Sequence, residues 1–188
     1  MANNDAAFGF RPTRHLSGGQ MRTEEYAIAA NYGSDIFTGQ VVEAGAGGGI
    51  EQAAAGDTQQ LGVFGGCFYT DPTTSKPTYN AYYPASTNAS DIVAYVYADP
   101  DIVFEAQHDG TGTAAMNHSA MDFVGVAGSS TTGISTSELD TSTSGTGAGF
   151  KQIGISKDPE NSDTSAANAN AYCVFSTGEH VYKLITAV

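Results

Sequence analysis

The chain of 188 residues has no tryptophan, two cysteines and seven lysines and arginines against 20 aspartates and glutamates. With a formal net charge of −13, too few clustered cations remain to follow the phosphates of a nucleic acid, so we expect no nucleic-acid partner. No apolar run reaches the length of a membrane span, and the N-terminus lacks the apolar stretch of a secretory signal. We therefore expect that the chain does not associate with a membrane and that it is synthesised in a reducing cytoplasm.

The scarcity of cysteine leaves room for one disulfide at most. Cys67 and Cys173 both lie in apolar, strand-like runs, which favours two buried free thiols in a chain made in the cytoplasm. The sequence does not tell whether the two residues meet, so a disulfide stays the alternative. Neither has another Cys or His at ligand spacing, and we expect no metal site from them.

Motifs that carry catalysis are also missing. No Gly-x-Ser-x-Gly elbow is present, and the glycine-rich stretches lack the P-loop lysine. We expect His108 and His118 to be solvent-facing loop residues rather than metal ligands. Asp99 and Asp101 flank a proline and offer oxygens to calcium, but no ordered series of ligands follows, so a simple turn is expected. The sequence predicts neither an enzyme nor a bound metal or cofactor.

The chain is instead rich in Gly, Ser, Thr, Asn and Ala, with ten tyrosines and nine phenylalanines among short Val and Ile runs. Roughly ten to twelve short strand candidates separated by turn residues predict an all-β fold, either a small β-barrel or a β-sandwich. The one helical pattern covers residues 114–121 with Thr113 as its N-cap, so we expect at most one or two short helices. The β-rich body, residues 23–188, can be one unit or two subdomains with a boundary near 109–113.

Three strand predictions have particular consequences. Residues 61–70 are predicted as a central strand buried on both sides, with Gly65-Gly66 as a bulge or a close approach to another part of the chain. Residues 91–98 and 102–107 are joined by an Asp-Pro-Asp turn, and we expect them to pair as a hairpin. The C-terminal residues 180–188 are predicted as a further strand.

Positive charge is concentrated at the start of the chain. Arg11, Arg14 and Arg22 lie in the first 22 residues with a single acid, a net charge of +2, whereas residues 23–150 hold 15 acids and one lysine. This segregation predicts an extended basic N-terminal arm that contacts a partner the acidic body does not touch. A frayed terminus that is basic by chance is the alternative.

The arm also carries apolar side chains that a solvated tail does not need, and we expect it to be dispensable for folding of the body. The predicted partner contacts are its phenylalanines, its arginines and the proline between them: Phe8, Phe10, Arg11, Pro12, Arg14 and Arg22. Tyrosine is enriched at subunit interfaces. The weaker candidates for contacts between copies are therefore three tyrosines in one strand-like run: Tyr79, Tyr82 and Tyr83.

Several stretches together resemble a family of tailed-bacteriophage head structural proteins. The opening AAFGFRPTRHLSGGQMRTEEYAIAANYGSDIFTGQVV is similar to that family's start, although Gln40 stands where an acid is common. The match continues through LGVFGGCFYTDP, KPTYNAYYPA, IVAYVYADPDIVFEAQHDG, GSSTTGISTSELDTST and FKQIGISKDPENS, whereas the ending AYCVFSTGEHVYKL departs from the family pattern. The resemblance covers most of the chain.

The resemblance implies a capsid cement or decoration protein on the outer surface of the virion head. Such a protein binds the mature lattice after expansion and bridges neighbouring major capsid proteins. Its partners would be the major capsid protein and further copies of itself as a dimer or trimer. An extended arm fits this role, because it can add strand hydrogen bonds and salt bridges across a capsid protein.

Two other functions remain open. A head or tail fibre or host glycan-binding module would use the tyrosines and the Ser/Thr/Gly-rich residues 128–149, but the chain lacks tryptophan and any stalk-like repeat. Another minor head or tail structural protein could be built from a similar β-fold, and its low copy number per virion would distinguish it. An enzyme with an unrecognised site is the least favoured alternative.

Overall fold

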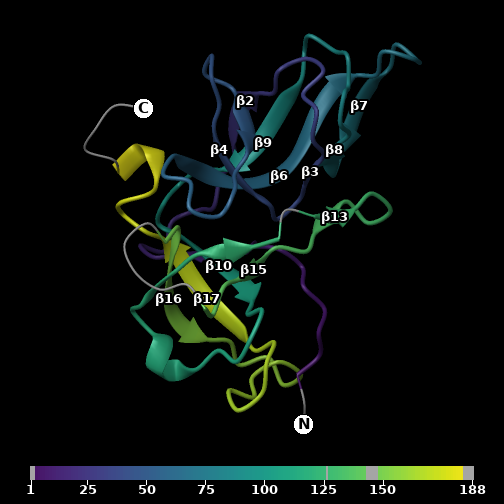
Figure 1. The fold of residues 1–188 in the computed structure, drawn as a ribbon. Coiled ribbons are helices and arrows are strands. Elements are labelled where there is room, and N and C mark those ends of the chain that lie inside the picture. Colours follow the sequence, from purple (N-terminus) through teal and green to yellow (C-terminus); the bar gives the residue numbers. More distant parts are fainter. Residues whose placement is uncertain (1–2, 126, 143–147, 184–188) are drawn as a thin grey trace.

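The computed structural model describes residues 3–125, 127–142 and 148–183, which form two lobes built from antiparallel strands (Figure 1). The all-β prediction is confirmed. Helical structure in these ranges is restricted to two 3-10 turns, η1 (Ala114–Met116) and η2 (Val181–Lys183). Of the two predicted architectures the closed barrel is not formed, because the sheets of the described residues stay open.

The lower lobe of Figure 1 contains a five-stranded sheet in the order β1-β10-β17-β16-β11. Its strands are β1 (Arg11–His15), β10 (Ile102–Gln107), β17 (Asn170–Phe175), β16 (Phe150–Ile155) and β11 (Ala120–Met121). The central strands β10 and β17 are buried along most of their length, and their sequences are mostly apolar, with Glu105, Gln107 and Asn170 as polar residues.

The upper lobe contains a six-stranded sheet in the order β2-β9-β6-β4-β5, with β7 also paired to β6. Its strands are β2 (Glu24–Ala27), β9 (Val93–Tyr97), β6 (Gln60–Thr70), β4 (Val41–Ala44), β5 (Ile50–Gln52) and β7 (Pro77–Asn80). In β9 the burial alternates, with Ala94 and Val96 facing the core and the flanking residues partly exposed. This is the pattern of a strand with one solvated face.

Three two-stranded pairs complete the described fold. They are β3 (Ile36–Phe37) with β8 (Tyr82–Tyr83), β12 (Phe123–Val124) with β15 (Glu138–Leu139), and β13 (Gly128–Ser129) with β14 (Ile134–Ser135). The Ser/Thr/Gly-rich residues 128–149 therefore contribute β13, β14 and β15, and turns and coil join these strands where the structure describes the stretch.

The long strand β6 holds the two lobes together. Its register against β9 shifts between Phe64 and Cys67, which confirms the bulge predicted at Gly65-Gly66. Beyond this point the strand continues into the outer part of the upper lobe. Val63 belongs to the apolar core of the lower lobe, whereas Phe64 and Cys67 belong to that of the upper lobe. One strand thus contributes to both cores.

The predicted hairpin between residues 91–98 and 102–107 is wrong. β9 lies between β2 and β6 in one sheet, and β10 lies between β1 and β17 in the other. Both edges of each strand are therefore already paired, and the turn at Asp99–Asp101 carries the chain from the upper lobe to the lower one. The alternation of apolar and polar residues within each strand cannot distinguish such a crossing from a hairpin. Each strand would show the same alternation in either arrangement.

Two local predictions near the ends of elements also fail. Thr113 makes no capping hydrogen bond, and the helix predicted over 114–121 is limited to η1. His118 has a positive φ of 71°, and its amide donates to Gln152 O at 2.7 Å. The chain then enters the sheet as β11, which begins at Ala120. Of the strand predicted at 180–188, residues 181–183 form η2, and residues 184–188 lie outside the described residues.

The two thiols are free and buried, as predicted. Burial raises the pKa of Cys67 to about 12, and it raises the pKa of Cys173 as well. Both cysteines therefore behave as small apolar core residues with little thiolate at neutral pH.

The N-terminal segment is extended but packed against the body along most of its length. Asn3 donates to the carbonyls of Asp163 and Ala167 at 2.8 and 2.7 Å, and the Phe10 amide donates to Gly39 O at 2.8 Å. The Phe10 side chain is fully buried and stacks on Phe150 with ring centroids 4.3 Å apart. This differs from the dispensable arm that the sequence suggested, since Phe10 fills part of the lower core.

We expect Phe10→Ala to lower the free energy of unfolding by about 3 to 5 kcal/mol, because it leaves a ring-sized cavity in the core. Urea unfolding followed by tyrosine fluorescence measures the change. Phe8→Ala is the matched control: this ring is only partly buried and should cost about 1 kcal/mol or less. Equal effects of the two substitutions would contradict the described packing.

Candidate docking segment at residues 11–22

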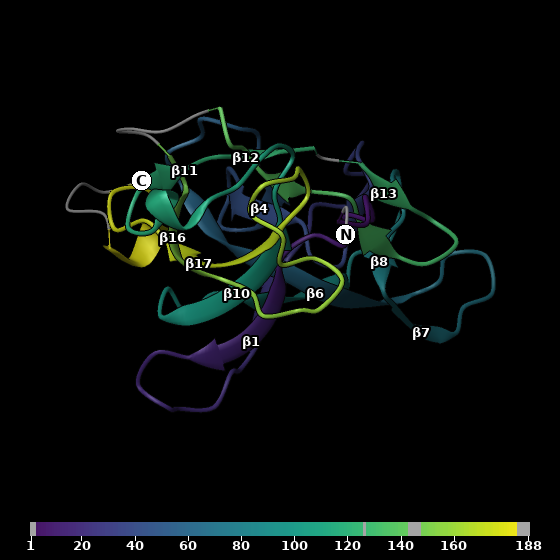
Figure 2. The same ribbon diagram turned by 90° about the horizontal axis from the view of Figure 1, so that it is seen from below.

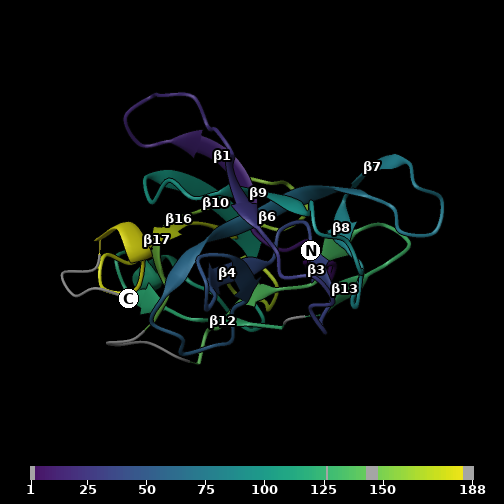
Figure 3. The ribbon, with the colours of Figure 1, turned by 90° about the horizontal axis from the view of Figure 1, so that it is seen from above.

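Residues 11–22 form a surface that differs from the rest of the molecule in charge and in how far it projects from the body. They comprise β1 and the loop 16–22 and are called the docking segment below. β1 is an edge strand, and it projects with its loop away from the body when the molecule is seen from below and from above (Figures 2 and 3). Every residue from 16 to 22 is exposed, including the large apolar side chains of Leu16 and Met21, which are 52% and 38% exposed.

The docking segment has an electrostatic character opposite to that of the body. It holds three arginines and no acid, while the chain as a whole carries a net charge of −13. The Arg14 and Arg22 side chains are exposed, and neither forms an ion pair with another part of the chain that the structure describes. Their charge is therefore available to a negatively charged partner surface.

The free edge of β1 is poorly suited to pairing with another strand. Pro12 has no amide hydrogen, and the register against β10 shifts between Pro12 and Arg14. At the shift, the Thr13 hydroxyl donates to Val103 O at 3.0 Å. Docking by strand addition, which the sequence suggested, is therefore disfavoured, and the side chains remain as the means of contact.

The base of the loop is fixed by polar contacts to the turn that joins the lobes. The Leu16 amide donates to Asp101 O at 2.9 Å, and His15 Nε2 lies 2.9 Å from Asp99 Oδ2. Burial alone raises the pKa of Asp99, but the amide of Asp101 and the imidazole of His15 outweigh it and hold that pKa below its usual value. The Lys183 ammonium contacts Asp101 Oδ1 at 2.8 Å.

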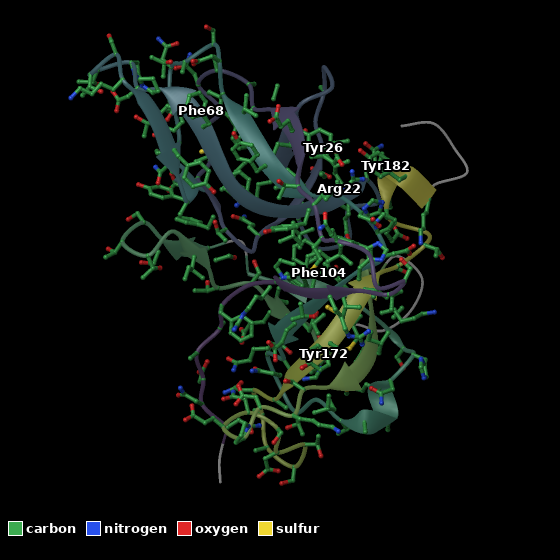
Figure 4. All side chains as sticks on the ribbon, turned by 180° about the vertical axis from the view of Figure 1, so that it is seen from behind. Arg22, Tyr26, Phe68, Phe104, Tyr172 and Tyr182 are labelled. Carbon is green, nitrogen blue, oxygen red and sulfur yellow. The ribbon has the colours of Figure 1, made fainter. Side chains whose placement is uncertain are left out.

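Beside this base lies a hollow of about 290 Å³ whose walls include Arg22, Glu24, Asp99 and Tyr182. Figure 4 shows Arg22, Tyr26 and Tyr182 gathered on one side of the molecule. The Tyr26 and Tyr182 hydroxyls are hydrogen-bonded to each other, and burial together with this contact raises the pKa of Tyr26. The walls of the hollow therefore combine polar side chains, one of them cationic, with the apolar residues Ala98 and Pro100.

A second hollow, of about 250 Å³, lies at the other end of β1 and is apolar. Four of the predicted contact residues line it together with residues of both lobes: Phe8, Phe10, Arg11, Pro12, Thr38, Gly39, Phe64, Tyr97 and Ile134. The Arg11 guanidinium stacks over the Phe8 ring, 4.1 Å from its centroid. The structure thus brings Phe8, Arg11 and Pro12 together, while the buried Phe10 contributes to the floor and is removed from the set of exposed contacts.

The three candidate tyrosines do not form one surface. Tyr83 is fully buried, and Tyr82 stacks on Phe37 with ring centroids 5.4 Å apart. Tyr79 is 64% exposed, and its ring lies 6.0 Å from that of Tyr95. Tyr83 is therefore excluded from contacts between copies, Tyr82 is partly buried, and Tyr79 is the most exposed of the three.

Sequence reasoning missed the aromatic neighbours of Tyr79. Tyr95 and Tyr97 lie on the partly exposed face of β9, and a Cβ at Gly66 would approach the Tyr79 hydroxyl to 2.6 Å. The alternation in residues 91–98 places both tyrosines on one face and was sufficient to find them.

The prediction that His108 faces solvent is also wrong. Its ring is fully buried, with Nδ1 2.9 Å from Ala169 O and Nε2 2.8 Å from Gln152 Oε1. Burial lowers the pKa of His108. His118, by contrast, is exposed as expected.

Comparison with protein-family models, with curated proteins and with solved structures finds no match. Among the described residues, no helix is both long enough and apolar enough to span a membrane.

The packing of the N-terminal segment leads to a prediction for limited proteolysis. Trypsin should cut first after Arg22, because exposed loops are the preferred sites of nicking. Residues 1–22 should then stay bound in native buffer, held by Phe10 and by the β1–β10 ladder, and separate only in urea. Size-exclusion chromatography with mass spectrometry measures this. Release of the peptide under native conditions would argue for a loosely attached arm.

Proposed function

We propose that this chain is a structural virion protein that binds the phage head lattice as a cement or decoration protein. The proposal depends on the docking segment, whose loop 16–22 is exposed throughout and which presents arginines without ion pairs in the described structure, together with exposed apolar side chains, on an otherwise acidic molecule. The sequence resemblance to tailed-phage head proteins supplies the identity of the partner.

In this proposal the docking segment lies across a negatively charged face of the major capsid protein. Arg14 and Arg22 provide charge complementarity, and Leu16 and Met21 bury apolar surface at the contact. The acidic body then faces solvent, where its charge keeps neighbouring copies apart. Each contact with the lattice is weak, but many copies bind the same shell. Their contacts add up and stabilise the shell together.

The double variant Arg14→Glu/Arg22→Glu should bind expanded heads that lack this protein at least tenfold more weakly than the unchanged chain. Both side chains are exposed, so the reversal should leave the fold intact. Co-sedimentation with heads, at low and at physiological salt, measures the affinity. Salt should weaken binding of the unchanged chain, because the contact is between charged surfaces.

Lys76→Glu/Lys157→Glu is the matched control, since it changes the net charge by the same amount at two exposed positions outside the docking segment. This control should bind heads almost as well as the unchanged chain. Equal loss in both double variants would point to net charge alone, and undiminished binding by the arginine variant would refute the docking segment.

A host glycan-binding module is the second candidate, because the exposed Tyr79 lies beside the partly exposed Tyr95, and such a pair can stack on a sugar. If this function holds, the isolated protein binds a glycan in an array, and Tyr79→Ala abolishes that binding while Arg14→Glu/Arg22→Glu does not. A copy number per virion of about a dozen or fewer, instead of one comparable with the major capsid protein, would favour a minor head or tail component.

A further inference from the structure

Three side chains with metal-ligating atoms meet at the base of the loop 16–22 of the docking segment, which is called the docking loop below. His15 ends β1, while Asp99 and Asp101 belong to the turn that joins the two lobes. One ligand atom from each of the three lies within 4.8 Å of the others. The imidazole comes from a part of the chain more than 80 residues away from the carboxylates, since His15 and Asp99 are 84 positions apart. Only the fold brings them together.

The donor set selects a class of ion. One imidazole nitrogen with two carboxylate oxygens suits zinc and similar divalent transition metals, whereas calcium takes six to eight oxygen ligands. His15 Nε2 and Asp99 Oδ2 are 2.9 Å apart, a spacing at which both atoms can contact one ion at about 2.0 to 2.2 Å. We propose that His15, Asp99 and Asp101 form a binding site for a divalent transition-metal ion of the zinc class.

The surroundings of His15 fit this role. Its side chain is 10% exposed, so the ring is held in place. The Ser17 amide donates to Nδ1 at 3.2 Å, and Ser17 Oγ lies 2.8 Å from the same nitrogen. When an ion replaces the proton on Nε2, the proton moves to Nδ1, so Nδ1 no longer accepts from the Ser17 amide and instead donates to Ser17 Oγ. Ligating histidines generally use the second ring nitrogen in this way, which fixes the ring orientation.

The site also has an opposing group and an open side. Lys183 Nζ lies 2.8 Å from Asp101 Oδ1, so an ammonium already neutralises one of the carboxylates that the ion would use. Lys183 therefore competes with the metal. Asp99 also borders the hollow of about 290 Å³ beside the base of the loop. This hollow leaves room for water as a further ligand.

A bound ion would fasten the end of β1 to the turn between the lobes and thereby fix the base of the docking loop. The site does not depend on the proposed capsid role, because its ligands, their spacing and their opposing lysine are properties of the isolated chain.

Titration of the full chain with Zn²⁺ in a calorimeter tests the site. We expect one ion per chain and at least tenfold weaker binding in His15→Gln, which keeps a polar side chain but loses the imidazole nitrogen. Asp99→Asn should show a similar loss. Lys183→Met should bind Zn²⁺ as tightly as the unchanged chain or several times more tightly, because the competing ammonium is gone.

His118→Gln is the control, since His118 is an exposed histidine in another loop and its loss should leave binding unchanged. Circular dichroism verifies that each variant is folded. No Zn²⁺ binding up to millimolar concentration would overturn the proposal. Equal binding in His15→Gln and the unchanged chain, or loss of binding in Lys183→Met, would overturn it as well.

Discussion

The insertion of Phe10 into the lower core is the interaction on which the rest of the arrangement depends. Gly9 adopts a φ of 72°, and a Cβ there would lie 2.7 Å from Gly39 O, so only glycine allows the close approach. The Phe10 amide then donates to Gly39 O, and the Gly39 amide donates to Phe64 O, each at 2.8 Å. The N-terminal segment is thus tied to β6, the strand that enters both cores. β1 and its loop take their positions from this junction.

This junction places the arginines of the N-terminal segment on a fixed part of the surface. Phe10 holds the chain before β1, which lies at the edge of the lower sheet, and the loop after it projects from the body. Arg14 and Arg22 are therefore presented on a short, tethered segment rather than on a free tail. A tethered segment loses less conformational entropy on binding than a disordered one, so weaker contacts suffice for docking.

Most patterns that are local in sequence predicted correctly, although the helix over 114–121 did not form, and those that depend on distant residues did not. The all-β class, the bulge at Gly65-Gly66 and the buried free thiols follow from alternation, glycine position and apolar surroundings. The hairpin failed because the turn after β9 leads to a different sheet, and only long-range pairing decides which. The exposure of Phe10 and His108 was misjudged for the same reason, since their partners, Phe150 and Gln152, lie more than 40 positions away.

The candidate site shows the same division. The exposed arginines were found from composition, because charge segregation along the chain survives folding when the segment stays at a surface. The His15 cluster was not found, since Asp99 and Asp101 alone offer too few oxygens and the imidazole joins them only after β1 pairs with β10. That pairing places His15 opposite Ile102, directly after the turn. The same strand pairing therefore fixes both the direction of the docking loop and the third ligand at its base, so the two proposed sites share one structural origin while remaining chemically separate.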